Sequence, residues 1–274
     1  MRFVGIDLAW SERNPSGVAV IGAQGVVQKA SAALWTNDEI CQFAGLDSSE
    51  GAVIAVDAPL VVKNVDGSRP VEQELTQIFW PYDANPYPAN LSNPAFDENG
   101  RIQRLVRHLE GLGFVNRPII PKRSEQHSFV EVFPSPAQVI LFPGANRQSH
   151  LHVRALRYKR KKGRHKNKKD RSWTEVHSEW EIYRARLRSL GCREPRMTFS
   201  PEVNTQLGVD ITGFEGPAYK QWDDLLDGIF CGYLAYYFWH RGEEGCWVVG
   251  KSATGAVTLP KCQLADCPLP IAPE

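Results

Sequence analysis

The sequence lacks the features of an exported, membrane-spanning or zinc-stabilised protein. Its six cysteines are scattered over 274 residues, with no C-x-x-C pair and no spacing typical of a zinc site. No apolar run reaches the ~18 residues that a transmembrane helix needs. The first residues follow a strand pattern rather than that of a signal peptide. We therefore expect reduced thiols, a cytoplasmic location and no membrane partner.

The chain also has almost no net charge, because 32 lysines and arginines stand against 31 acidic residues. The overall charge therefore indicates no partner, but its distribution is uneven. A dense run of lysine and arginine extends from Arg154 to Arg171. The length and the 42% hydrophobic content suit one sizeable core. We expect a single domain over residues 1–274, with residues 144–172 as a basic insertion within it.

The chain opens with three strand patterns, at residues 3–10, 17–22 and 26–34. Short turn-rich links join them, which predicts an antiparallel meander. A helix capped by Thr36, with Glu39 as its capping-box partner, leads to an apolar strand at residues 52–58. If this fourth strand lies parallel to the first, both are buried on both faces. The pattern predicts a βββαβ opening and an α/β fold.

The rest of the chain predicts mainly helices. A strand is expected at residues 128–133, and a hairpin at residues 246–259. A long proline-rich connection spans residues 61–96 and is more typical of a functional loop than of a neutral one. Helices are expected at residues 71–79 and 100–113, from near 136, at 173–190, and from near Asp223 to Trp239.

Acidic residues recur at the positions that such a fold brings together. Asp7 and Asp57 lie near the carboxyl ends of two strands, and Asp224 and Asp227 share one face of the last helix. Crowded carboxylates repel one another unless protons or cations relieve the repulsion. Their hard oxygens suit Mg²⁺ or Mn²⁺, and paired ions of this kind activate water against phosphodiesters. The pattern therefore indicates phosphodiester hydrolysis.

Each acid taken alone also fits an ordinary structural role. Asp223 or Asp224 suits the start of a helix, where it would cap the helix and complement its dipole. Asp7 suits a pair with an arginine, and Asp57, which precedes Ala-Pro, suits the start of a turn. Glu131 suits an outward position on an edge strand.

Several segments together resemble one known family. VGIDLAW, NPSGVAVI, VIAVDAPL, EVFPSPA, YKRKKGR and DDLLDGIFCGYLA are similar to the proteins grouped as domain of unknown function 429, which are regarded as predicted nucleases of ribonuclease H-like fold. The acidic plan is also distantly similar to that of Holliday-junction resolvases. The resemblance implies a mixed five-stranded sheet, flanked by helices, with strands 1–3 antiparallel and strand 4 parallel to strand 1.

The resemblance also implies a role for each acid. Asp7 would be the metal-bridging carboxylate, Asp57 a second ligand, and Asp224 with Asp227 the ligands from the final helix. Two Mg²⁺ or Mn²⁺ ions are implied, and Glu131 would assist catalysis from its E-V-[FY]-P element. Gly228 departs from the alanine that is usual after the second helix acid.

The basic segment is a candidate nucleic-acid contact. Its positive charges suit a phosphate backbone, and Tyr158 could stack on a base. A solvated insertion is the alternative interpretation, and for Arg69, a further candidate phosphate contact, the alternative is an ordinary surface arginine. The residues expected to contact nucleic acid are Arg69, Tyr158, Lys159, Arg160, Lys161, Lys162 and Arg164.

The leading hypothesis is thus a divalent-metal-dependent nuclease acting on DNA or RNA. The alternative is a non-catalytic nucleic-acid-binding or scaffold module on the same fold. A sugar-kinase-like or actin-like ATPase is disfavoured, because Asp7 is followed by LAWSERNP rather than by a Gly/Thr-rich phosphate-gripping hairpin. The aromatic end of the last helix suits either the core or the interface of a homodimer.

Overall fold

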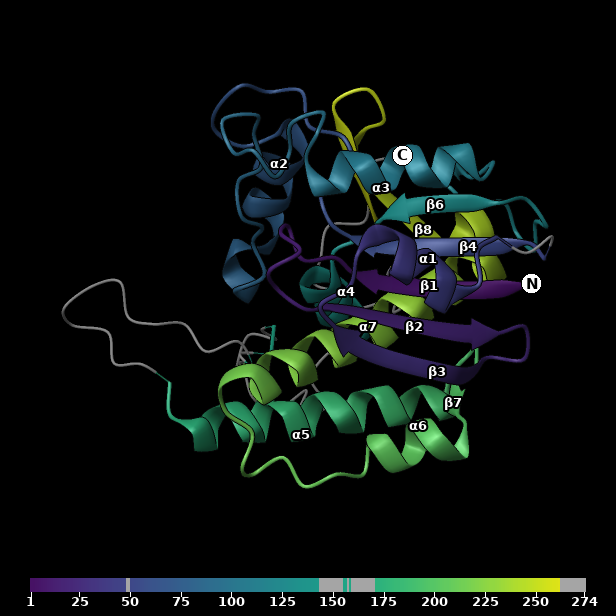
Figure 1. Cartoon of the computed structure of the whole chain (residues 1–274), viewed down its shortest axis with the longest axis vertical. Helices are drawn as coiled ribbons and strands as arrows, with labels where there is room; N and C mark the ends of the chain where they lie inside the picture. The colour runs from purple at the N-terminus through teal and green to yellow at the C-terminus, as the bar shows by residue number, and fades with distance from the viewer. Residues whose placement is uncertain (48–49, 143–154, 157, 159–170, 262–274) are drawn as a thin grey trace.

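The computed structural model describes residues 1–47, 50–142, 155–156, 158 and 171–261. Among these residues, seven strands form one mixed sheet in the order β5-β6-β4-β1-β2-β3-β7, with helices on both faces (Figure 1). The strands of this sheet are β1 (Arg2–Asp7), β2 (Ser16–Gly22), β3 (Val26–Ala33), β4 (Ala52–Asp57), β5 (Val115–Asn116), β6 (Ser128–Glu131) and β7 (Thr198–Phe199).

The pairing of the first four strands confirms the predicted opening. β1 pairs antiparallel with β2, and β2 pairs antiparallel with β3. β4 returns beside β1 in parallel, after a helix whose Thr36–Glu39 capping box is present. The four residues of β1 between its two ends are buried, as expected for a strand covered on both faces.

The described sheet has seven strands where five were expected. β6 is the expected fifth strand and lies parallel to β4. The two additional strands, β5 and β7, are two residues long each and extend the sheet at its edges. Strands this short show no alternating pattern, so the sequence gives no signal for them.

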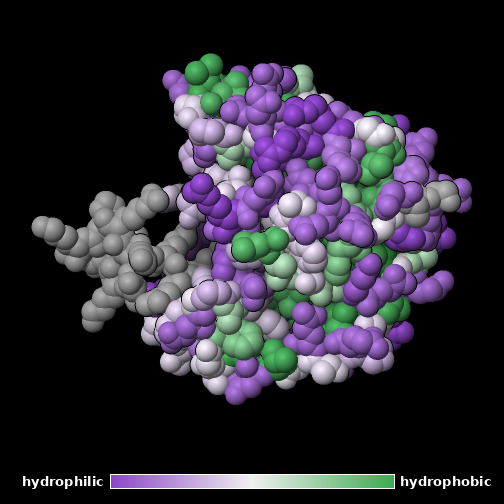
Figure 2. Space-filling model, viewed as in Figure 1, coloured by the Kyte–Doolittle hydropathy of each residue, from purple (hydrophilic) through white to green (hydrophobic). Residues whose placement is uncertain are grey.

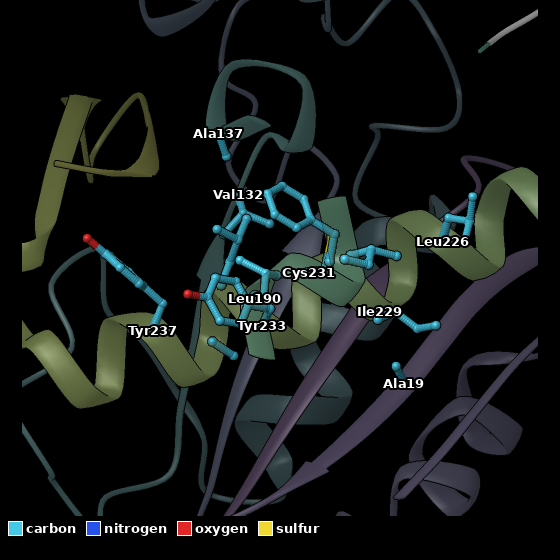
Figure 3. Packing of buried hydrophobic residues seen from close by; sticks show 14 of the residues in the cluster. Ala19, Val132, Ala137, Leu190, Leu226, Ile229, Cys231, Tyr233 and Tyr237 are labelled. Carbon is cyan, nitrogen blue, oxygen red and sulfur yellow. The ribbon is translucent and has the colours of Figure 1, made fainter. Parts of the chain in front are cut away.

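The helices divide between the two faces of the sheet (Figure 1). α1 and α3 cover one face, where Ile40 and Leu105 pack with Ile6 of β1. The long helix α7 covers the other face, and its Leu226, Ile229 and Tyr233 belong to the same cluster as Ala19 of β2 (Figure 3). The α-helices are α1 (Asn37–Ala44), α2 (Pro70–Phe79), α3 (Arg101–Gly111), α4 (Pro134–Leu141), α5 (Trp173–Ser189), α6 (Pro201–Gln206) and α7 (Gly216–Arg241).

Shorter elements complete the described chain. The predicted C-terminal hairpin is confirmed by two antiparallel strands that form a separate sheet. An isolated parallel bridge from Val132 to Thr258 joins this hairpin to the end of β6. These elements are η1 (Trp80–Tyr82), η2 (Leu190–Cys192), η3 (Gly242–Gly245), β8 (Cys246–Lys251) and β9 (Gly255–Pro260).

Glycines let α7 approach the sheet closely. A Cβ atom on Gly5 of β1 would overlap the backbone of α7 at Gly228 and Gly232. A Cβ atom on Gly228 would lie 2.8 Å from the carbonyl carbon of Gly17 in β2. The alanine expected from the family pattern at position 228 would therefore clash here, and glycine is the residue that this contact requires.

The surface is mixed in character. The face shown in Figure 2 is mostly hydrophilic, with scattered hydrophobic side chains. The aromatic end of α7 does not contribute exposed rings, because Tyr233, Tyr236, Tyr237 and Phe238 are buried within the chain. In the described ranges, no helix combines the length and the apolar composition that crossing a membrane requires.

Candidate active site

Asp7 and Asp57 lie side by side at the carboxyl edge of the sheet. They are the last residues of β1 and β4, and the parallel register pairs them directly. Neighbouring strands are about 4.8 Å apart, so the two carboxylates start from adjacent backbone positions. Both residues are half-buried and line a cavity of about 280 Å³. The fold therefore brings these two predicted site residues together.

Both acids face α7. Side chains alternate along a strand, so Asp7 shares a face with Gly5, and Asp57 shares a face with Ala55. Gly5 contacts the backbone of α7, and Ala55 belongs to the core cluster on the α7 side. The two carboxylates therefore point toward the helix that carries the other predicted acids.

The acids of α7 lie inside the helix rather than at its start. α7 begins at Gly216 with Glu215 as its N-cap, seven residues before the expected start. Asp224 and Asp227 are buried, as is the neighbouring Asp223. The helix-capping role that the sequence left open for Asp224 is therefore excluded, and its burial needs another compensation.

The backbone of Asp224 contacts β2 at the residue that pairs with Asp7. A Cβ atom on Gly17 would overlap the carbonyl group of Asp224, and Gly17 is the β2 partner of Asp7. Burial raises the pKa of Asp224 to about 9, and the charge of Asp7 adds to this shift. Asp224 of α7 therefore interacts electrostatically with Asp7 of β1, which stands beside Asp57 of β4.

Lys220 partly compensates this negative charge. Its ammonium group pairs with Oδ1 of Asp224 and lies 3.7 Å from Oδ2 of Asp223. This interaction opposes the rise in the pKa of Asp224. Lys220 was not among the predicted site residues, although its spacing of four residues from Asp224 on one helix is the usual signal of such a pair.

Asp227 is held by two tyrosines. The hydroxyl groups of Tyr158 and Tyr183 donate to its Oδ1 at 2.7 and 2.9 Å. Burial and then the charge of Asp227 raise the pKa of Tyr183 well above its usual range. Tyr158, expected to stack on a base, is 2% exposed and its ring lies 5.1 Å from that of Tyr183. A base could reach the Tyr158 ring only if this contact opened.

Glu131 and Arg69 form a buried ion pair with each other. Two nitrogens of Arg69 donate to the two oxygens of Glu131, at 2.6 and 3.1 Å. Glu72 receives a further bond from Arg69, at 2.8 Å. Burial raises the pKa of Glu131, and Arg69 opposes that rise.

Glu131 also faces away from the two strand-end aspartates. Its register partner is Val56, whose side chain belongs to the core on the α1 side of the sheet. Oε2 of Glu131 accepts a bond of 2.8 Å from the backbone of Leu60 and so ties down the chain just after β4. Arg69 and Glu131 both line the cavity, but their polar atoms are engaged with protein groups.

The acidic side chains at this site have the oxygen atoms that a divalent cation binds, but their spacing is not that of a formed ion site. Carboxylate oxygens are the ligands that Mg²⁺ and Mn²⁺ prefer. Oδ2 of Asp224 is buried and has no hydrogen-bond partner among the described residues. Within those same residues, however, no three acidic, histidine or cysteine side chains are close enough to share one ion. Asp7, Asp57 and Asp224 therefore provide carboxylate oxygens, but these are not close enough together to coordinate one ion.

The remaining predicted contacts fall mostly beyond the described part of the chain. Lys159, Arg160, Lys161, Lys162 and Arg164 lie outside the described residues. Arg171, at the end of the same basic segment, lines the cavity beside the two aspartates.

The cavity has aromatic residues that sequence analysis did not select. Trp10, Tyr87 and Phe133 line it together with Asp7 and Asp57. Tyr87 belongs to the proline-rich connection that was expected to be functional. Trp10 stands three residues after Asp7, and Phe133 two residues after Glu131. The short sequence separation of Trp10 and Phe133 from these acids could have indicated that they lie at the same site.

The comparisons with known proteins give one match. No curated protein and no solved structure matches the chain. The family model described as "Protein of unknown function (DUF429)" matches residues 5–251, which include Asp7, Asp57, Asp224 and Asp227. Because the match covers most of the chain, this protein belongs to the DUF429 family.

Proposed function

We propose that this protein is a divalent-metal-dependent nuclease that hydrolyses phosphodiester bonds of DNA or RNA. The observation that carries the proposal is the direct pairing of Asp7 with Asp57 at the edge of a cavity. Ligands of α/β proteins bind at this carboxyl edge of the sheet. Asp224 adds a third carboxylate, which is coupled electrostatically to Asp7.

The energetics of the three acids favour a bound cation. Burial and then the like charge of Asp7 disfavour the ionised form of Asp224, and its raised pKa expresses that cost. Lys220 compensates from one side only, since it contacts Oδ1 and leaves Oδ2 without a hydrogen bond among the described residues. A divalent cation held by Asp7 and Asp57 would bring positive charge to this acidic group.

In this proposal each residue has a defined task. Asp7 and Asp57 would hold the ion, and Asp224 would complete the set when its carboxyl group is ionised. When bound, the ion would neutralise charge on the scissile phosphate and activate water. The ion pair of Arg69 with Glu131 would position the chain after β4 through Leu60 rather than touch substrate. The two tyrosines would fix the rotamer of Asp227.

The sheet supports a ribonuclease H-like classification within this proposal. Three consecutive antiparallel strands, β1 to β3, are followed by β4 parallel to β1 and β6 parallel to β4. This is the arrangement expected for that fold, with β5 and β7 as short additions at the edges. The second ion and the nucleic-acid contacts of the basic segment are further parts of the same proposal.

Cleavage assays test the proposal directly. End-labelled DNA and RNA strands should be cut in Mn²⁺ or Mg²⁺, and the chelator EDTA should stop the reaction. Asp57→Asn should lower the cleavage rate at least ~100-fold, because it removes a ligand of the ion. The control Asp47→Asn changes an exposed acid and should leave the cleavage rate unchanged. Salt-sensitive binding that EDTA leaves unchanged, with no cleavage in either metal, would instead favour the non-catalytic binding module.

A further inference from the structure

The cavity beside Asp7 and Asp57 has the size and lining of a site for one nucleobase. Its volume of about 280 Å³ lies just under the ~300 Å³ at which pockets for drug-sized ligands begin. Trp10, Tyr87 and Phe133 line it, and aromatic rings of this kind stack on bases. A base pair within a duplex could not enter such a space, whereas a single unpaired base could.

Tyr87 is the ring most available for stacking. It is 64% exposed, so a base could cover it without displacing protein atoms. Its loop is nevertheless pinned close by, because Ala89 donates to Oε2 of Glu72 at 3.0 Å and Asn90 donates to the carbonyl of Gly67 at 2.7 Å. A ring on a pinned loop loses little conformational entropy on binding.

The same buried network connects this loop to the sheet. Glu72 binds Arg69, and Arg69 binds Glu131 at the end of β6. This set of buried ion pairs therefore holds the loop of Tyr87 against β6, the strand that neighbours β4 and its Asp57. The ion pairs of Arg69 would thus position the loop that carries Tyr87, in addition to the chain after β4.

The carboxylates and the rings line a single cavity. Trp10 follows Asp7 by three residues, and its ring is fixed against Phe96 at 4.7 Å between centroids. A base held by these rings would bring its own phosphodiester to the side of the cavity that Asp7 and Asp57 line.

We propose that the cavity binds one unpaired nucleotide of a DNA or RNA strand, with its base stacked on Tyr87 and its phosphodiester at Asp7 and Asp57. The inference rests on the proposed nuclease function and adds the substrate class: single-stranded, bulged or flipped-out positions. Asn85 and Ser135 also line the cavity and bring hydrogen-bonding side chains to a base edge.

The test uses 2-aminopurine, a fluorescent base that stacking quenches. The probe is placed in a short single strand of DNA, in the matching RNA strand and in the fully paired DNA duplex, all with Ca²⁺, a cation that carboxylate oxygens bind, in place of the Mn²⁺ or Mg²⁺ of the cleavage assay. Wild type should quench and bind one or both single strands. Tyr87→Ala should weaken that binding about ten-fold, because the binding free energy of stacking one base on one aromatic ring corresponds to a change in affinity of about that size.

Two further variants separate stacking from general effects. Tyr87→Phe keeps the ring and should bind as wild type does. Trp80→Ala removes an aromatic ring that is 70% exposed in the same connection but does not line the cavity, so it should also leave binding unchanged. Comparison of the DNA and RNA strands shows which backbone the site accepts.

The outcomes for substrate class and for hydrolysis are independent. Equal quenching by the duplex, unchanged binding in Tyr87→Ala, or no binding of any strand would overturn the unpaired-nucleotide site. If wild type and Tyr87→Ala cut a fully paired duplex at equal rates, the unpaired-nucleotide site would be overturned. The nuclease proposal would still hold. Tyr87-dependent binding without cleavage in Mn²⁺ would overturn only the nuclease proposal.

Discussion

At the scale of residues, Asp7 shows how a carboxylate can end an apolar strand. It is half-buried, it pairs with Asp57 across the parallel strands, and its charge adds to the effect of burial in raising the pKa of Asp224 in α7. The repulsion among the three acids is the property from which the proposed ion binding follows.

The pH dependence of stability should reveal the burial of Asp224. Its folded pKa of about 9 lies far above the ~3.9 of an unfolded aspartate, so folding retains a proton that unfolding releases. The free energy of unfolding should therefore fall as pH rises from about 4 to 9. In EDTA at pH 8, Asp224→Asn should be more stable than wild type by at least ~1 kcal/mol, because the amide does not ionise.

Urea titrations at pH 5 and pH 8 measure this effect. The difference in stability between the two pH values should shrink in Asp224→Asn and stay as in wild type in Asp47→Asn, an exposed acid. An equal loss of stability with pH in wild type and Asp224→Asn would contradict the burial argument.

Arg69 should be important for stability rather than for phosphate contact. Arg69→Met leaves Glu131 and Glu72 buried without their cation, which typically costs ~3–5 kcal/mol. Arg104→Met removes an exposed ion pair with Glu12 and should cost under ~1 kcal/mol. Chemical denaturation of both variants checks the contrast, and a stable Arg69→Met protein with weakened nucleic-acid binding would reverse the interpretation.

At the scale of elements, the contact of α7 with the sheet places Asp224 near Asp7. Gly17 faces the backbone of Asp224, and Gly5 faces Gly228 and Gly232. These close contacts leave no room for side chains, so the helix position depends on the glycines. The site is therefore set by backbone packing and not only by the acids themselves.

Gly17→Ala should displace α7. The added methyl group would overlap the carbonyl of Asp224, and overpacking of this kind costs ~1–3 kcal/mol. Cleavage should fall further than stability explains, because Asp224 moves with the helix. Gly213→Ala, where the added atom meets open space, is the matched control. Full activity in a stable Gly17→Ala protein would show that the helix position does not govern the site.

At the scale of the whole molecule, ion binding should stabilise the fold. A ligand that binds only the native state at 100 times its Kd adds ~2.7 kcal/mol. Mn²⁺ should therefore raise the melting temperature of wild type, and the melting temperature of Asp7→Asn should hardly change when Mn²⁺ is added. A thermal-shift titration measures both proteins in parallel, and an equal shift in the two would place the ion elsewhere.

The sequence predicted the centre of the molecule better than its edges. β1, β2 and β4 carry long apolar patterns because they are buried on both faces, so the Asp7–Asp57 pair followed from them. β5 and β7 are too short for any pattern. The true start of α7 was missed although Pro217 in its first turn was an available signal, since proline is favoured at the first positions of a helix.

Long-range partners could not be predicted. Glu131 and Arg69 are 62 residues apart, and Tyr158 and Asp227 are 69 residues apart. Which buried polar groups meet depends on the tertiary fold, and no local pattern encodes it. As a result, Arg69 and Tyr158 were expected at a nucleic-acid surface, whereas both are buried and bonded to acids.

The most direct test of the central claim is anomalous diffraction from crystals soaked in Mn²⁺. We expect a manganese peak in contact with the carboxylates of Asp7 and Asp57, which disappears in Asp7→Asn crystals soaked in the same way. A well-ordered site that holds no manganese at this pair, in a crystal form that leaves the cavity open, would contradict it.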